Sequence, residues 1–241
     1  MRRRILPLLL AAALLAAGGC SRQAAPSAPS PPEGPAETVQ NTAPDPPDEP
    51  VPAPQEPLPE PETADFVRVT DHLPQVRVDL RYATENNFTG QIIYDFTDAC
   101  LRYGTAEKLA RAQAALEDAG YSLLIWDAFR PVEAQFRLWE VCPDPVYVAN
   151  PETGYSSHSR GNTVDVTLTD REGNDVEMPS GFDDFSPLAD RDYSDVSPEA
   201  AANARLLEDV MTDCGFRPYS GEWWHFTDTD DYPVEEVFSP G

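Results

Sequence analysis

Positive charge is scarce in this sequence. Of its 241 residues, 17 are Lys or Arg and 42 are Asp or Glu, so the formal net charge is −25. A protein that binds nucleic acid needs a cationic surface to neutralise phosphates. The composition therefore argues against DNA or RNA as a partner and favours solubility, while it says little about the fold.

Long apolar runs and zinc-finger cysteine patterns are also missing. The apolar run near the N-terminus has about a dozen residues, whereas a membrane-spanning helix needs about 20. There are four cysteines, and none has the spacing of a zinc finger. Beyond Cys20, two of Cys100, Cys142 and Cys214 could pair in an exported protein, with one left over. Three buried thiols are the equally open alternative.

The N-terminus has the layout of a bacterial export signal. It reads "MRRRILPLLLAAALLAAGGCSRQ", with three arginines, a short apolar run and small residues before Cys20. The stretch "AAGGC" resembles a lipobox, with Ala17 where that motif usually has Leu. We predict a lipoprotein signal over residues 1–20 and a lipidated Cys20, which anchors the chain to a membrane without spanning it. An ordinary secretory signal, with Cys20 incidental, is the alternative.

The next segment is rich in Pro, Ala and acidic residues and has almost no large apolar side chains. Such a composition cannot bury enough surface to offset the entropy lost on ordering. We therefore predict a disordered, extended tether over residues 21–64. The remaining residues 65–241 are long enough for one well-packed domain.

Hydrophobic periodicity within this domain predicts a mixture of helices and strands. Strands are expected over residues 76–83, 121–129, 162–170 and 222–226. Helices are expected over 105–119 with Thr105 as its cap, over 130–141, and over 198–214 with Ser197 as its cap. No regular βαβ alternation is present, so we predict an α+β fold, with helices packed on a small, mainly antiparallel sheet.

Histidine is scarce too, with three in the chain, and two lie in unusual local sequences. His158 and Asp165 lie on either side of an Arg-Gly turn in "SSHSRGNTVDVTLTD", and His225 lies in "GEWWHF". A catalytic zinc takes three protein ligands from His, Asp, Glu or Cys and keeps a fourth position for water. We predict that His158, Asp165 and His225 bind one zinc ion per chain.

Two further residues are candidates for chemistry beside that ion. Glu222 lies three residues before His225 and can act as general base without ligating the metal, although a fourth ligand or an exposed carboxylate is also possible. Arg130 directly follows the predicted strand over residues 121–129, in "WDAFRP", and can stabilise the oxyanion of a tetrahedral intermediate. A structural ion pair is the alternative for Arg130.

The order of several long motifs adds a family resemblance. The stretches are "YATENNFTG", "LLIWDAFRP", "SSHSRGNTVDVTL", "MPSGFD" and "EWWHF". Together they resemble the D-alanyl-D-alanine dipeptidases of the VanX type, within the zinc D,D-peptidases. The resemblance covers roughly residues 66–235 and leaves out the predicted signal and tether.

The resemblance implies a role for each matching residue. His158, Asp165 and His225 match the zinc ligands, Glu222 the general base and Arg130 the arginine that stabilises the transition state. Ser156 or Ser157 is similar to serines that line the substrate site. Asp183, which has Asp184 beside it, is similar to the carboxylate that receives the free amino group of the dipeptide. The implied reaction is hydrolysis of D-Ala-D-Ala to two D-alanines.

Three other readings remain open at this point. A D,D-carboxypeptidase that acts on peptidoglycan stem peptides needs an open groove on the amino side of its substrate. A zinc-containing module that binds cell-wall peptides without catalysis would be expected to lack Glu222 or Arg130, which are both present. A purely structural zinc is usually closed by four ligands. The predicted extracytoplasmic location favours wall recycling over a role in precursor synthesis.

Overall fold

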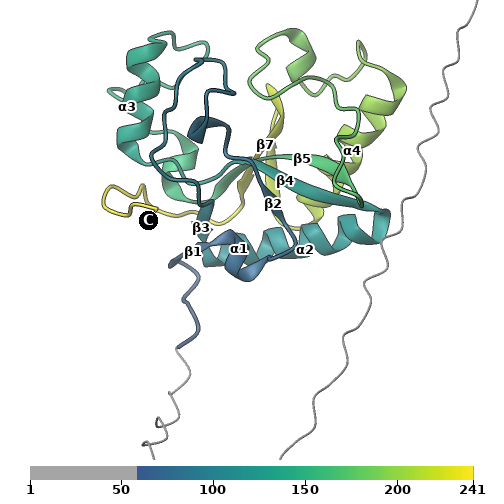
Figure 1. Ribbon diagram of the computed structural model, residues 1–241, viewed down its shortest axis with the longest axis horizontal. Helices are drawn as coiled ribbons and strands as arrows, with labels where there is room; N and C mark the ends of the chain where they lie inside the picture. Colours follow the sequence, from purple (N-terminus) through teal and green to yellow (C-terminus); the bar gives the residue numbers. More distant parts are fainter. Residues whose placement is uncertain (1–58, 241) are drawn as a thin grey trace, which may run out of the picture. The chain divides into compact units, whose positions relative to one another are not determined.

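The structure, a computed structural model, describes residues 59–240 (Figure 1). The predicted signal peptide, Cys20 and most of the predicted tether lie outside this range. Within it, no helix has the length and apolar character needed to cross a membrane. The elements of the domain are β1 (Phe66–Arg68), α1 (Val69–His72), β2 (Arg77–Val78), η1 (Arg81–Ala83), β3 (Cys100–Arg102), α2 (Tyr103–Ala119), β4 (Tyr121–Asp127), α3 (Val132–Val141), η2 (Ser157–Arg160), β5 (Thr163–Asp170), η3 (Pro187–Ala189), α4 (Pro198–Asp213), β6 (Phe216–Tyr219) and β7 (Glu222–Asp228).

A five-stranded sheet in the order β2-β4-β5-β7-β6 forms the centre of the domain. The β2–β4 pair is parallel, and the β4–β5, β5–β7 and β6–β7 pairs are antiparallel. Strands β1 and β3 form a separate antiparallel pair. The predicted α+β fold with a mainly antiparallel sheet is therefore confirmed.

The core lies between the sheet and helices α2 and α4, which both pack on its strands. Helix α2 runs along the sheet in Figure 1. The predicted apolar stripe of α2, formed by Leu109, Ala112 and Leu116, is fully buried there. Val164 and Val166 of β5 join the same core. Burying a side chain such as Leu or Val contributes about 2 kcal/mol, so this packing holds the central strands in place.

The two long helices differ in how well their starts were predicted. Helix α4 begins as expected, because the Ser197 hydroxyl accepts a hydrogen bond from the amide of Ala200 at 3.0 Å. The prediction that Thr105 caps α2 is wrong, since the helix begins at Tyr103. The Thr105 hydroxyl instead donates to the buried carboxylate of Asp228 at 2.7 Å. A tertiary partner decided its role, and the local sequence gave no sign of that partner.

The strand predicted over residues 76–83 is much shorter than expected. Only Arg77 and Val78 pair with β4, and the chain then turns into the short helix η1. The alternation of apolar and polar residues continues through this turn because Leu80 and Tyr82 are also buried. Burial without strand pairing therefore produced the longer pattern.

A bulge in β4 shapes the region where the central strands end. The register with β5 shifts between Ile125 and Asp127, so that Asp127 lies opposite Asp165. Bulges re-aim side chains and are common beside active sites. This one brings the residues that follow β4 toward the first turn of η2, where the Arg130 amide donates to the His158 carbonyl at 3.3 Å.

The three cysteines of the described residues are unpaired. Cys100 is buried, and Cys142 and Cys214 are partly buried. Burial is the largest cause that raises the pKa of the Cys100 thiol, to about 11. A thiol with this pKa stays protonated at neutral pH and is a poor nucleophile.

Candidate active site

Asp165 and His225 come from neighbouring strands and lie directly opposite each other. They are Cα partners in the antiparallel pairing of β5 with β7, so their side chains leave the sheet on the same face. Asp165 Oδ1 lies 3.0 Å from Nδ1 of His225. Asp165 is almost fully buried. Burial raises its pKa, but His158 and His225 outweigh this effect and lower it below the ordinary value, so the carboxylate is ionised.

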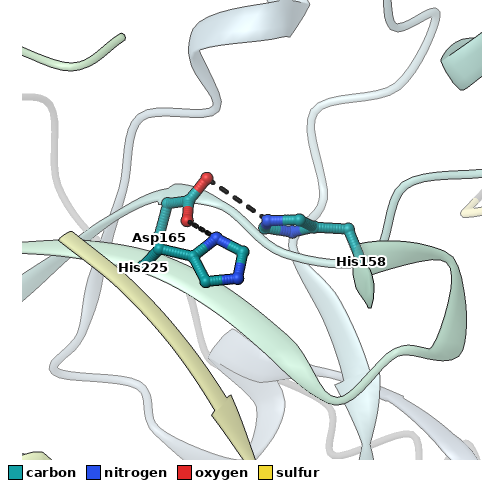
Figure 2. Close-up of side chains that lie close together, drawn as sticks. All are labelled: His158, Asp165 and His225. Atoms are coloured by element: carbon teal, nitrogen blue, oxygen red, sulfur yellow. Dashed lines mark ion pairs between the residues drawn. The ribbon is translucent and has the colours of Figure 1, made fainter. Parts of the chain in front are cut away.

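His158 reaches the same point from the short helix η2, which precedes β5. Its Nε2 lies 3.4 Å from Oδ2 of Asp165 (Figure 2). The chain can turn from η2 into β5 because Gly161 adopts a left-handed φ of 74°. A Cβ on Gly161 would also lie 2.4 Å from the Phe66 ring, so no other residue fits at this turn.

The geometry of this cluster fits a divalent metal ion. His158, Asp165 and His225 each offer one ligand atom, and the three atoms lie within 4.8 Å of one another. Asp165 Oδ1 is buried and has no aligned hydrogen-bond donor. A native protein rarely leaves a buried carboxylate oxygen without a partner, and a bound cation would satisfy it. Two imidazoles and one carboxylate are a donor set that suits zinc.

Neighbouring groups orient both imidazoles toward the cluster. His158 Nδ1 lies 2.7 Å from the carbonyl oxygen of Ala128, and donating to this carbonyl leaves Nε2 with its lone pair free. His225 Nε2 lies 3.4 Å from the Ser157 hydroxyl and 3.5 Å from that of Thr227, which leaves Nδ1 as the ligand atom. Such outer partners fix the tautomer and the plane of each ring.

Glu222 begins β7 and lies beside the cluster. Its Oε2 is 3.5 Å from Nδ1 of His225. Burial raises the pKa of Glu222 to about 7; His225 opposes this shift, and the carboxylate of Asp165 adds to it. A carboxyl group with a pKa near neutrality can both accept and release a proton at physiological pH.

Arg130 is buried and held rigidly. Its Nη2 donates to Asp127 at 2.6 Å, its Nη1 donates to Gln135 at 2.9 Å, and its Nε donates to the Tyr94 hydroxyl at 3.2 Å. A guanidinium group has five N–H donors, so two of them remain for a ligand. The structure thus contains the ion pair with Asp127 that was the alternative for Arg130. Arg130 also lines a cavity that the metal-ligand candidates line as well, so both roles are compatible.

Asp183 lies in the loop before η3 and lines the same cavity as Arg130. Its Oδ2 accepts a hydrogen bond from the Tyr82 hydroxyl at 2.7 Å. Burial is the largest cause that raises its pKa, to about 7, while the bond from Tyr82 lowers it. The neighbouring Asp184 is occupied locally, since it accepts from the Ser186 amide at 2.9 Å. Of this pair, Asp183 lines the cavity, whereas Asp184 does not.

These groups surround one cavity of about 360 Å³. Every site residue predicted within the described range lines it: Arg130, Ser156, Ser157, His158, Asp165, Asp183, Glu222 and His225. Ser156 is buried and accepts from the His158 amide at 3.3 Å, which leaves its hydroxyl proton for a ligand. Cys20, the remaining predicted site residue, lies outside the described residues.

Several residues of the site were not predicted. Asp127 interrupts the apolar stretch "LLIWDAF", and a fully buried acid three residues before an arginine was a signal that sequence analysis could have used. Tyr82 reaches the site from η1 and Tyr94 from the loop after it. Tyr82 begins the motif "YATENNFTG", but nothing in that motif assigned it a role in the site. Tyr147 and Tyr219, which line the outer part of the cavity, also gave no signal.

Comparison with known proteins gives consistent matches over the folded part of the chain. A peptidase M15 family model, described as "D-ala-D-ala dipeptidase", matches residues 62–239. The chain is similar to the D-alanyl-D-alanine dipeptidase of Escherichia coli K12, with 38% identity over 165 residues, which cover 68% of this chain and 85% of the relative. Proteins of the same description from Streptomyces coelicolor and Enterococcus faecium are 37% and 36% identical, over 68% and 66% of this chain and 92% and 89% of theirs.

Proposed function

The chain belongs to the peptidase M15 family, and from that premise we propose that it hydrolyses the dipeptide D-Ala-D-Ala to two D-alanines. One observation carries the proposal: a His-Asp-His cluster, a carboxyl group beside it and a fixed arginine all line a single small cavity. The relatives that match over most of their own length carry the name of this activity.

His158, Asp165 and His225 would hold the metal, and zinc suits this donor set. When bound, zinc supplies Lewis-acid chemistry, which activates water and polarises the scissile carbonyl. The remaining chemistry belongs to side chains of the protein. Glu222 takes the proton of the attacking water on a carboxylate oxygen and delivers it to the nitrogen of the departing D-alanine.

Arg130 stabilises the negative charge that develops on the carbonyl oxygen. Its two free N–H donors are held in place by the three bonds that anchor the guanidinium group. A preorganised donor needs no reorientation during the reaction and therefore lowers the barrier more than a mobile one. Asp127 and Gln135 act here as positioning residues, because they bond to Arg130 and do not line the cavity.

Asp183 and the two serines bind the ends of the dipeptide. With one oxygen of Asp183 occupied by Tyr82, the other can accept a hydrogen bond from the substrate ammonium group. The hydroxyl groups of Ser156 and Ser157 line the cavity and can donate to the substrate carboxylate. A site that recognises both charged termini selects for length, since the distance between them grows with every added residue.

The activity can be tested on the full chain supplied with zinc. We expect release of D-alanine from D-Ala-D-Ala, complete loss of this release after chelation of the metal, and its recovery when zinc is added back. A pentapeptide stem ending in D-Ala-D-Ala, assayed in parallel, should react at least 100-fold more slowly. Equal rates on both substrates would identify a D,D-carboxypeptidase instead. Stoichiometric zinc without hydrolysis of either substrate would favour a binding module.

We further propose that the chain is exported and anchored through lipid on Cys20. Support comes from the sequence alone, namely the basic, apolar and small-residue order that ends at Cys20. An anchored enzyme would act on peptides outside the cytoplasm, which suits wall turnover. In detergent phase partitioning of the expressed chain, wild type should enter the detergent phase and Cys20→Ser the aqueous phase. Aqueous partitioning of both proteins would exclude the anchor.

A further inference from the structure

Four aromatic rings form an arc around the side of the cavity that contains Asp183. The Tyr147 ring packs on Phe185 with centroids 4.6 Å apart, and Phe185 packs edge-on against Phe88 at 5.2 Å. Phe88 in turn contacts Tyr82 at 6.4 Å. The rings come from three parts of the chain, namely η1 with the loop after it, the loop after α3, and the loop before η3. The arc therefore exists only in the folded domain.

The arc begins and ends on the cavity wall. Tyr147 and Tyr82 both line the cavity, and the Tyr82 hydroxyl donates to Asp183. Phe185 lies two residues after Asp183, and it does not line the cavity itself. The Tyr147–Phe185 contact therefore joins the loop after α3 to the loop that carries Asp183, just outside the point where a substrate ammonium group would bind.

Both loops are held close to this contact. The amide groups of Tyr147 and Val148 donate to the Asp144 carbonyl at 3.0 and 2.9 Å, and the Val148 side chain is buried. Gln135 donates to the Ala149 carbonyl at 2.7 Å, which ties the same loop to α3. On the other side, the turn beside Phe185 is closed by the bond from the Ser186 amide to Asp184.

We propose that the contact between Tyr147 and Phe185 limits substrate length by closing the cavity on the amino side of a bound dipeptide. This inference rests on the proposed function, and it adds two specificity-determining residues to it. Rings packed at 4.6 Å leave no gap between them for a peptide chain. A residue added before the dipeptide would have to part the two rings and expose their apolar faces.

This role differs from that of Asp183. The Asp183 carboxylate favours a free ammonium group at one position, whereas the two rings exclude atoms beyond that position. Tyr147 and Phe185 are both partly exposed, at 45% and 37%, so truncating either one opens the rim without creating an internal cavity. Loss of either ring should have the same effect, because one contact involves both.

The test compares two substrates on the zinc-loaded full chain, the dipeptide D-Ala-D-Ala and the tripeptide L-Ala-D-Ala-D-Ala. The measured quantity is the ratio of kcat/KM for the tripeptide to that for the dipeptide. We expect Tyr147→Ala and Phe185→Ala each to raise this ratio at least tenfold, and the double variant to raise it no further. Tyr147→Phe, which keeps the ring, should retain the wild-type ratio.

Val146→Ala is the matched control. Val146 is a highly exposed neighbour of Tyr147 on the cavity rim, and its side chain has no ring to close the cavity. Its ratio should equal that of wild type. Calorimetry in the Glu222→Ala background should show the same shift in relative affinity for the two peptides.

The outcomes separate the two proposals. An unchanged ratio in both alanine variants, with the dipeptide hydrolysed, would overturn the role of the rings and leave the proposed function intact. Equal rates of hydrolysis of the dipeptide and the tripeptide by wild type would also overturn the role of the rings. If wild type does not hydrolyse the dipeptide, the proposed function fails, and the inference fails with it.

Discussion

Replacing Glu222 by Gln is expected to lower kcat for D-Ala-D-Ala hydrolysis about 10³-fold, because general acid–base catalysis typically contributes 10² to 10⁴. The amide keeps the size of the side chain but cannot accept and return a proton. The Glu222 oxygen lies 3.5 Å from Nδ1 of His225 and belongs to no metal cluster of the described residues, so the variant should still bind one zinc ion. Rates of D-alanine release and metal content measured on the same sample check both statements.

Glu140→Gln serves as the control for this variant. Glu140 is an exposed carboxylate on α3, and its replacement makes the same chemical change away from the cavity. A Glu222→Gln protein that kept more than a tenth of the wild-type rate would show that another group moves the proton. A variant that lost its zinc would show that Glu222 is a ligand, which was one of the alternatives open at the sequence level.

Asp165→Asn should weaken zinc binding by more than about 100-fold, since even changes to the partners of metal ligands cost 10- to 100-fold. The amide is neutral and removes the charge that the two imidazoles surround. We expect hydrolysis of D-Ala-D-Ala to fall to background at micromolar zinc. A ligand present at 100 times its Kd stabilises a fold by about 2.7 kcal/mol. Thermal unfolding should therefore show a zinc-dependent rise in Tm for wild type and none for the variant.

The thermal readout does not depend on catalysis, so it tests the metal site by itself. Asp118→Asn, a neutralised aspartate exposed on α2, should keep the full zinc-dependent rise. A rise of equal size in Asp165→Asn would mean that zinc binds elsewhere or without this carboxylate, and the His-Asp-His assignment would then be wrong.

Local patterns predicted most helices and strands of this domain, and they failed where distant groups decided the outcome. Helix α4 begins at its predicted cap because Ser197 acts on its own backbone. Thr105 has the same type of side chain, but its hydroxyl is taken by Asp228, which lies 123 residues further along the chain. The strand at residues 76–83 was overestimated because an alternating pattern reports burial, whereas pairing depends on where the partner strand ends.

The candidate site shows the same division. Scarce histidines, the Arg-Gly turn and the "EWWHF" strand marked the three metal ligands and Glu222 in the sequence, because ligands and bases can only be certain residue types. The sequence also marked Arg130, first by its place after a buried strand and then by the resemblance, and it marked Asp183 by the resemblance alone. It did not show what holds them, since Tyr82, Tyr94 and Gln135 are ordinary residues whose roles depend on position.

The sequence by itself determined the chemistry available to this protein: an α+β domain, a His-Asp-His donor set and a carboxyl group next to one ligand. Only the tertiary structure decided that Asp183 and not Asp184 lines the cavity, that Arg130 keeps free donors despite its ion pair, and that Tyr147 meets Phe185 at the rim. The physical reason is that residue type determines the chemistry of a side chain. Hydrogen-bond partners and packing between distant parts of the chain determine the position and orientation of that side chain.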